Sequence, residues 1–202
     1  MAEIPGIVII EDHPVMLEGL AAFLAKTGRW NVKGTASNLE EAKKLLAVTA
    51  VDMVLIDIQL KDGWGLDIIP WYDTEKPNDI KPVMAVYTTF NDHAHVSAAL
   101  SLGVKAYITK HRNQQELENA LQQALAEETY IDDMAQYNAE TFAKKTKFLS
   151  KREIEILTLV RQKHTNKEIA AELGISYRTV ENILSNVFGK TGIRSRYELE
   201  LL

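Results

Sequence analysis

The amino-acid sequence predicts a doubly wound α/β domain with a five-stranded parallel sheet, followed by a small all-α domain with a helix-turn-helix. Short apolar runs alternate five times with longer segments whose apolar residues recur at helical spacing, which is typical of such a sheet. After residue 147 the helical spacing continues alone. A chain of 202 residues, 46% hydrophobic and 25% charged, is long enough for one large domain or two small ones.

The five predicted strands are short and mostly continuous in apolar character, as expected when helices cover both faces of a sheet. They span Gly6–Ile10, Trp30–Thr35, Met53–Asp57, Val83–Thr88 and Ala106–Ile108. In doubly wound sheets, ligands bind outside the carboxyl ends of the strands. We therefore expect a functional site at that edge of the sheet.

The sequence also suggests where the domains begin and end. Residues 1–126 are predicted to form the sheet domain and residues 148–202 the helical domain. Residues 127–147 are polar, with few apolar residues to anchor them, so we predict a partly helical linker.

Three helices are expected in the second domain. Ser150 and Glu153 have the spacing of a capping box ahead of the first helix. A second helix follows Thr165, and Ser176 is the expected N-cap of a third helix over residues 179–190. Two short helices joined by a glycine-containing turn are typical of a helix-turn-helix.

Composition excludes several classes of function. The chain contains no cysteine, so it has no disulfides, no thiolate metal ligands and no thiol nucleophile. Its first apolar run, Ile7–Ile10, is far too short for a secretory signal or a membrane span, and we expect a cytoplasmic protein. The net charge is −5, and residues 148–202 contain nine basic and seven acidic residues, which leaves −7 for residues 1–147. An acidic module is thus followed by a mildly basic one.

Three carboxylates are expected to converge at the sheet edge. Glu11 and Asp12 follow the first strand, and Asp57 ends the third. Adjacent anions repel, so such a cluster needs a cation, and oxygen ligands in an open crevice suit Mg²⁺. Thr88 and Lys110, at the ends of the fourth and fifth strands, would add a hydroxyl and an ammonium group. Together these groups predict a phosphoryl site.

Four motifs in residues 1–126 resemble the signatures of response-regulator receivers, which have a flavodoxin-like fold. They are Glu11-Asp12-His13-Pro14, the segment Val54 to Gly65 around Asp57, Tyr87-Thr88, and Gly103 to Lys110. The resemblance implies that Asp57 accepts a phosphoryl group from the phosphohistidine of a sensor histidine kinase. The sequence departs from many receivers at Lys61 and His111, where proline is common.

The resemblance also implies a role for each residue around Asp57. Glu11, Asp12, Asp57 and the backbone carbonyl of Gln59 would be Mg²⁺ ligands. Three further residues would bind or sense the phosphoryl group: Thr88, Tyr107 and Lys110. His13 is interpreted as a loop residue rather than a ligand and His95 as a helix-surface residue, whereas Trp64 either shields an apolar edge or gates the site.

Residues 148–202 resemble the LuxR-type DNA-binding domain, which with the receiver is typical of the NarL/FixJ class. The resemblance rests on the segments Phe148 to Leu157, Asn166 to Ser176, Thr179 to Asn182 and Lys190 to Arg196. Three residues match base-reading positions: Glu181, Asn182 and Ser185. Five basic residues suit phosphate contacts: Lys167, Arg178, Lys190, Arg194 and Arg196.

The combined interpretation is a DNA-binding transcription regulator rather than an enzyme, phosphorylated at Asp57 and pairing as a homodimer on promoter DNA. Because the base-reading face is acidic, we expect single sites to bind weakly and two half-sites to compensate. One alternative is a regulator that works without phosphorylation. The other is an Mg²⁺-dependent aspartyl phosphatase, which would need a second aspartate where Gln59 stands.

Overall fold

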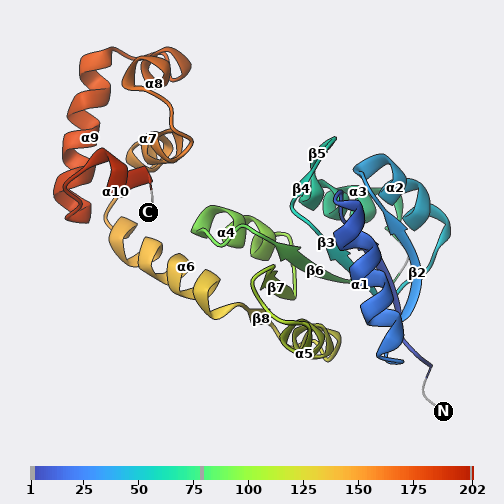
Figure 1. The fold of residues 1–202 in the computed structure, drawn as a ribbon. Coiled ribbons are helices and arrows are strands. Elements are labelled where there is room, and N and C mark those ends of the chain that lie inside the picture. Colours follow the sequence, from blue (N-terminus) through green and yellow to red (C-terminus); the bar gives the residue numbers. More distant parts are fainter. Residues whose placement is uncertain (1–2, 78–79, 201) are drawn as a thin grey trace. The chain divides into compact units, whose positions relative to one another are not determined.

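The computed structural model describes residues 3–77, 80–200 and 202 (Figure 1). The chain forms two compact units, Met1–Gln136 and Tyr137–Leu202. The domain boundaries at residues 126 and 148 stay predictions.

The first unit contains a parallel sheet with the strand order β2-β1-β3-β6-β7-β8. Its strands are β1 (Gly6–Ile10), β2 (Asn31–Ala36), β3 (Met53–Ile56), β6 (Val83–Thr88), β7 (Ala106–Thr109) and β8 (Tyr130–Ile131). All five predicted strands are confirmed to within one residue at each end. The predicted number of strands is wrong, because β8 adds a sixth strand beside β7.

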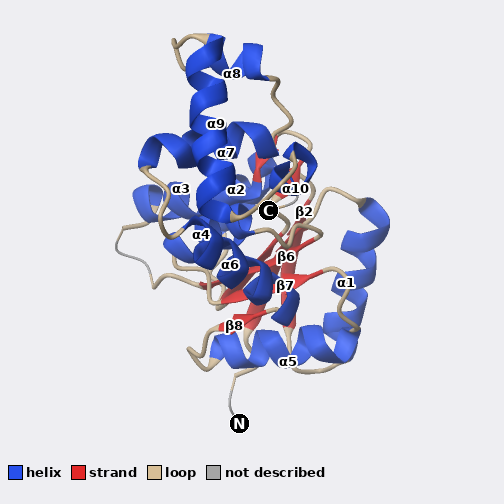
Figure 2. Ribbon diagram, turned by 90° about the vertical axis from the view of Figure 1, so that its left-hand side faces the viewer, coloured by secondary structure: helices blue, strands red, loops and turns tan. Residues whose placement is uncertain are grey.

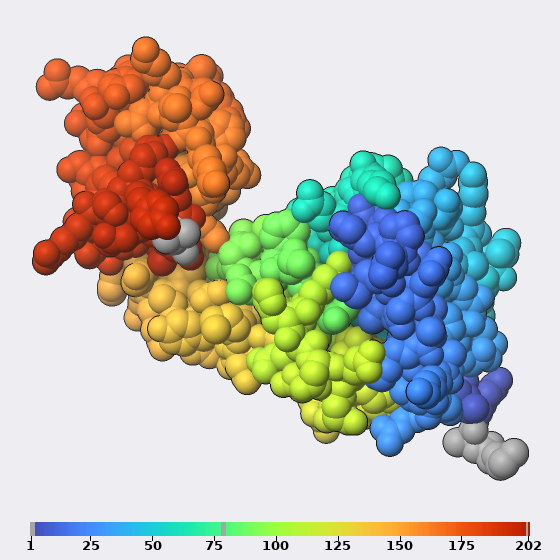
Figure 3. All heavy atoms as spheres, in the orientation of Figure 1, coloured from blue at the N-terminus to red at the C-terminus, as the bar shows by residue number. Residues whose placement is uncertain are grey.

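Helices cover both faces of this sheet (Figure 2). They are α1 (Pro14–Lys26), α2 (Leu39–Val48), α3 (Ile68–Glu75), α4 (His93–Ser101) and α5 (Gln114–Leu125). Leu20 and Leu24 of α1 share one buried core with Leu117 and Leu121 of α5, so these two helices cover the same face. In the space-filling view, the blue atoms of α1 lie next to the yellow-green atoms of α5 (Figure 3). The doubly wound fold is therefore confirmed.

A small hairpin and a short helix follow β3. The strands β4 (Gln59–Leu60) and β5 (Gly63–Trp64) pair antiparallel, and the 3₁₀ helix η1 (Gly65–Asp67) leads into α3. The backbone N–H of Gly65 donates to the carbonyl of Ile58 at 2.6 Å, which draws the hairpin back against the end of β3.

Residues 127–147, which the sequence predicts to be a partly helical linker, contain two elements of regular secondary structure. They are β8 and the helix α6 (Asp133–Thr146). The backbone N–H groups of Tyr130 and Asp132 donate to the carbonyls of Lys105 and Tyr107, each at 2.9 Å. Two residues are too few to show the alternation that reveals a strand in a sequence, and pairing with β7 is what makes them one.

Asp132, at the end of β8, is held by three neighbours, and we call this group of four residues the Asp132 anchor. Its carboxylate is buried and accepts hydrogen bonds from Thr109 Oγ1 at 2.8 Å, from Arg112 Nε at 2.6 Å and Nη2 at 3.2 Å, and from the backbone N–H of Met134 at 3.0 Å. Burial alone would raise the pKa of Asp132. The hydrogen bonds from Arg112, Thr109 and Met134 outweigh burial and hold this pKa below its ordinary value.

This lowered pKa predicts a pH-dependent contribution to stability. A carboxyl group with a lower pKa in the folded state stabilises the fold above its unfolded pKa and loses that effect as the pH falls through its folded pKa. Urea unfolding should therefore give a constant difference in free energy between the wild type and Asp132→Asn above roughly pH 5. The difference should shrink below the ordinary pKa of 3.8. An equal difference at every pH would contradict the prediction.

The second unit is helical. It contains most of α6, followed by α7 (Lys151–Arg161), α8 (Asn166–Glu172), α9 (Tyr177–Thr191) and α10 (Arg196–Glu200). The capping box of Ser150 and Glu153 is confirmed, as are the N-caps Thr165 and Ser176. The pair α8 and α9 packs together in one core as the predicted helix-turn-helix.

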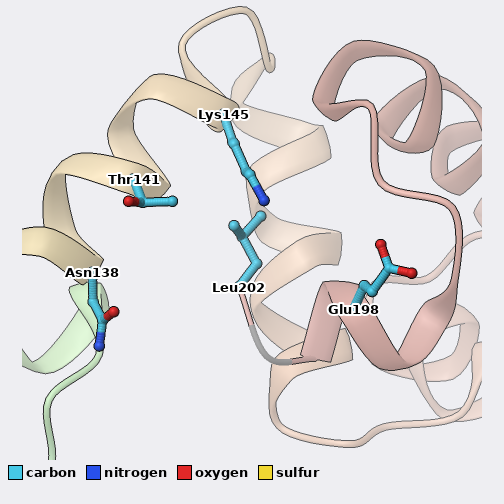
Figure 4. A pocket seen from close by; sticks show the side chains of 5 residues that line it. All are labelled: Asn138, Thr141, Lys145, Glu198 and Leu202. Carbon is cyan, nitrogen blue, oxygen red and sulfur yellow. The ribbon is translucent and has the colours of Figure 1, made fainter.

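Within this unit, a shallow hollow of about 220 Å³ lies between side chains of α6 and of the last residues (Figure 4). It is lined by Asn138, Thr141, Lys145, Glu198 and Leu202. Across both units, no helix in the described ranges has the length and apolar character needed to cross a membrane.

Candidate phosphoryl site and DNA interface

The acidic cluster forms where β1 and β3 end. These strands are parallel neighbours, with Ile10 opposite Ile56, and the N–H of Asp57 donates to the carbonyl of Ile10 at 2.9 Å. This register brings Asp57 beside Glu11 and Asp12, and these three acids and His13 each offer an atom within 4.8 Å of the others. All three carboxylates are buried.

Lys110 balances part of this negative charge. Its Nζ lies 2.7 Å from Oδ2 of Asp57 and 2.6 Å from Oε2 of Glu11. The backbone N–H of Lys110 donates to the carbonyl of Thr88 at 2.7 Å, which fixes the start of the side chain. Burial lowers the pKa of Lys110, but the hydrogen bonds to Asp57 and Glu11 outweigh burial and raise the pKa above its usual value. Lys110 is therefore a fixed cation beside Asp57.

One buried oxygen of the cluster, Asp12 Oδ1, accepts no hydrogen bond from the described residues. His13 Nδ1 lies 2.8 Å from this oxygen but without hydrogen-bond geometry, and the His13 side chain is 73% exposed. A buried carboxylate oxygen that accepts no hydrogen bond, among hard oxygen ligands, fits Mg²⁺. The use of the Gln59 carbonyl as a ligand stays a prediction.

Thr88 and Tyr107 meet at the loop between β6 and α4. Thr88 is fully buried, and its Oγ1 accepts from the N–H of Phe90 at 3.4 Å. Tyr107 is fully buried too, and its hydroxyl donates to the carbonyl of Phe90 at 3.0 Å. Burial, with the nearby charges of Asp92 and Asp57, raises the pKa of Tyr107, so its hydroxyl stays protonated as a donor. Both side chains therefore hold the backbone of Phe90.

Next to this loop, the ring of His95 contacts the rings of Phe90 and Trp64. The sequence did not indicate these ring contacts. The rings of Phe90 and His95 stack with centroids 4.1 Å apart and planes 9° apart, and Trp64 lies on His95 with centroids 5.1 Å apart. His95 Nδ1 also hydrogen-bonds Asp92. His95 lies in the first turn of α4 as expected, with its side chain 20% exposed, and its ring also contacts one ring from the loop and one from the hairpin.

The sequence did not indicate the contacts made by two further residues near the cluster. Lys61, where many receivers have proline, donates from Nζ to the backbone carbonyl of Asp12 at 3.0 Å. Arg112, two positions after Lys110, belongs to the Asp132 anchor. The pairing of strand ends could have suggested the contact of Lys61 with Asp12. The contact of Arg112 with Asp132 could not be foreseen, because it depends on the unexpected strand β8.

The helix α9 has the predicted buried and exposed faces. Val180, Leu184 and Val187 are buried in the core of the helical unit. The side chains on the other face are exposed: Arg178, Glu181, Asn182 and Ser185. This exposed face has the residue types that can read base edges, but their DNA contacts stay predictions.

The five basic residues assigned to phosphate contacts differ in their surroundings. Lys167, Arg178 and Arg194 are exposed. Lys190 instead pairs with the buried Glu153 at 2.7 Å. Arg196 donates to Asn166 Oδ1 at 2.8 Å and also to the carbonyl of His164, so it ties α10 to the start of α8. DNA phosphates would compete with these contacts at Lys190 and Arg196.

Comparisons with known proteins agree with this arrangement. Residues 7–122 match the family model of the response regulator receiver domain, and residues 147–202 match that of bacterial regulatory proteins of the luxR family. A transcriptional regulatory protein of Bacillus subtilis strain 168, YhcZ, is 32% identical over 96% of this chain and 93% of its own length. The oxygen regulatory protein NreC of Staphylococcus aureus strain USA300 is 31% identical over 96% and 94%.

Two solved structures show the same fold. One is the complex of the two-component response regulator RcsB with DNA, at 22% identity and a TM-score of 0.73, covering 98% of this chain and 96% of the other. The second is RcsB from Salmonella enterica serovar Typhimurium bound to the promoter P1flhDC with the phosphomimetic BeF₃⁻, at 23% identity and a TM-score of 0.74, covering 98% and 97%. With both family models matched in this order, the chain belongs to the NarL/FixJ class of two-component response regulators, which join a receiver domain to a luxR-type DNA-binding domain.

Proposed function

We propose that Asp57 accepts a phosphoryl group from a sensor histidine kinase in the cytoplasm and that the phosphorylated chain pairs as a homodimer on promoter DNA. The observation that carries this proposal is the position of Lys110 Nζ, 2.7 Å from Asp57, in a cluster where Asp12 Oδ1 accepts no hydrogen bond from the described residues. A carboxylate nucleophile needs positioning and neutralisation of charge more than proton transfer, and this cluster is built for both.

In this transfer an oxygen of Asp57 attacks phosphorus, and the bond from phosphorus to the kinase imidazole nitrogen breaks, with the electron pair returning to that nitrogen. Lys110 neutralises charge on the phosphoryl oxygens. Glu11, Asp12, Asp57 and the carbonyl of Gln59 would hold Mg²⁺, which supplies further charge neutralisation for the phosphoryl oxygens.

Phosphorylation makes Asp57 more negative and adds acceptor oxygens, and Thr88 is placed to answer that change. Its hydroxyl would turn to a phosphoryl oxygen and release the N–H of Phe90, which it holds at 3.4 Å. Tyr107 bonds the carbonyl of Phe90, so movement of that residue reaches Tyr107 directly. This geometry supports the roles of Thr88 and Tyr107 as switch residues.

The phosphatase alternative receives no support from the site. The side chain two positions after Asp57 is the amide of Gln59, which cannot act as a general acid. The family of this chain consists of transcription regulators rather than enzymes.

Beryllofluoride tests the proposed activation in the full chain. With Mg²⁺ it should convert monomer to dimer and raise the affinity for a DNA fragment with two half-sites by about tenfold or more. Light scattering and DNA titration at fixed salt measure the two effects. Unchanged mass and affinity would favour the regulator that works without phosphorylation.

The reading face of α9 can be tested by selecting bound sequences from random DNA. Asn182→Ala should relax the preference at one position of each half-site, with a loss of about 1–3 kcal/mol per bidentate contact. Arg194→Ala, which removes an exposed cation, should weaken binding to all sequences alike and leave the preference intact. An unchanged preference in Asn182→Ala would contradict the assignment of this face.

A further inference from the structure

The Asp132 anchor connects two segments that are far apart in the sequence. Thr109 and Arg112 lie on either side of Lys110, Thr109 at the end of β7 and Arg112 in the loop from β7 to α5. Met134 lies in the first turn of α6, the helix that continues into the second unit. One buried carboxylate, 1% exposed, therefore holds the Lys110 loop and the start of α6 at the same time.

The Asp132 anchor is connected to the phosphoryl site through Lys110 and its neighbour in the chain. Lys110 binds Asp57 and Glu11 through Nζ, and its neighbour Thr109 donates to Asp132 at 2.8 Å. On the other side, the carbonyl of Asp132 accepts from the N–H of Gln136 at 2.8 Å, so Asp132, directly before α6, bonds the first turn of this helix through both main chain and side chain. Two residues, Thr109 and Asp132, thus connect Lys110 to the helix that leaves the receiver unit.

The anchor also has the stiffness that a mechanical connection needs. Arg112 binds both oxygens of Asp132 in a forked arrangement, and its Nη1 lies 3.1 Å from Glu116 in the first turn of α5. A buried carboxylate that loses its partners is left uncompensated, so the group resists opening. A displacement of the loop would therefore move α6 rather than break the anchor.

We propose that the Asp132 anchor transmits the state of Asp57 to α6, with Asp132 and Arg112 acting as positioning residues. The inference rests on the proposed function, because the movement begins when Lys110 exchanges its contact with the Asp57 carboxylate for the oxygens of a phosphoryl group. The loop shifts with Lys110, and the anchor passes that shift to the first turn of α6. Without the anchor, the phosphoryl site would still form, but α6 would no longer respond.

Hydrogen exchange on the full chain, with and without beryllofluoride and Mg²⁺, separates these effects. In the wild type, exchange should change by about fivefold or more both in residues 109–113 and in residues 133–137. Asp132→Asn, which keeps the size of the side chain and one acceptor, should retain the change in 109–113 and lose it in 133–137. Arg112→Gln, with a partly exposed side chain, tests the same contact with less risk to folding.

A matched control removes another buried carboxylate of the same unit. Glu118 is 3% exposed and accepts from Trp30 Nε1 at 2.9 Å, outside the Lys110 loop. Glu118→Gln should keep both changes in exchange. If residues 133–137 still respond in Asp132→Asn and Arg112→Gln, the anchor does not transmit and the inference is wrong. If the wild type shows no change even in 109–113, the proposed function itself fails.

Discussion

Asp57→Asn is expected to abolish the incorporation of phosphoryl groups when the chain is incubated with a small phosphodonor and Mg²⁺. Asparagine has almost the same shape but no nucleophilic oxygen anion, and loss of a nucleophile should reduce labelling by about a hundredfold or more. Radiolabel counting or intact-mass spectrometry measures the adduct.

Asp62→Asn provides the control for this experiment. Asp62 lies in the turn between β4 and β5, and its two carboxylate oxygens accept from the N–H of Leu39, at 3.0 and 2.9 Å, at the start of α2. This variant should be labelled like the wild type. Equal labelling of the wild type and Asp57→Asn would remove Asp57 from the role of phosphoryl acceptor.

Gly65→Ala should damage the fold and the site together. A Cβ at this position would lie 1.9 Å from the carbonyl oxygen of Asp57 and 3.0 Å from Cγ2 of Ile56, so the backbone that carries the nucleophile would have to move. We expect a loss of about 3 kcal/mol in the free energy of unfolding and a marked fall in phosphoryl labelling. All three tryptophans lie in residues 1–136, so tryptophan fluorescence in urea follows this unit alone.

The opposite effect is expected for Gly19→Ala, the matched control. Gly19 is exposed in the middle of α1, and an added Cβ would meet nothing within 4 Å. Alanine loses less backbone entropy on folding, so stability should rise by about 0.5–1 kcal/mol with normal labelling. If Gly65→Ala behaved like Gly19→Ala, the close approach at Asp57 would not constrain the loop.

Sequence periodicity was sufficient for the elements with long, continuous patterns. The apolar runs Gly6–Ile10 and Val83–Thr88 gave strands with correct ends, because strands buried on both faces leave an uninterrupted signal. The convergence of Glu11, Asp12 and Lys110 on Asp57 followed from parallel pairing, since carboxyl ends of parallel strands share one edge. Both inferences depend on local pattern and a general rule of topology.

The features that the sequence did not reveal depend on contacts between distant segments. The strand β8 is defined by its pairing with β7 rather than by any pattern of its own. The ring stack around His95 needs the β4–β5 hairpin to meet α4. The ion pair of Lys190 with Glu153 joins α9 to α7, although Lys190 alone looks like any other basic residue beside DNA. No local rule predicts such partners.

The short strand β8 also has a consequence for solubility. Without β8, β7 would be the edge strand of the sheet, and its side chains are buried in the structure. The unpaired N–H and C=O groups of such an edge can pair with strands from other molecules. Tyr130 and Asp132 use their N–H groups to bond Lys105 and Tyr107, and β8 itself offers an edge only two residues long. Aggregation by strand addition is thereby discouraged at this edge. A chain proposed to pair reversibly with its own copies benefits from this, because polymers joined by strand addition separate far less readily than a reversible dimer.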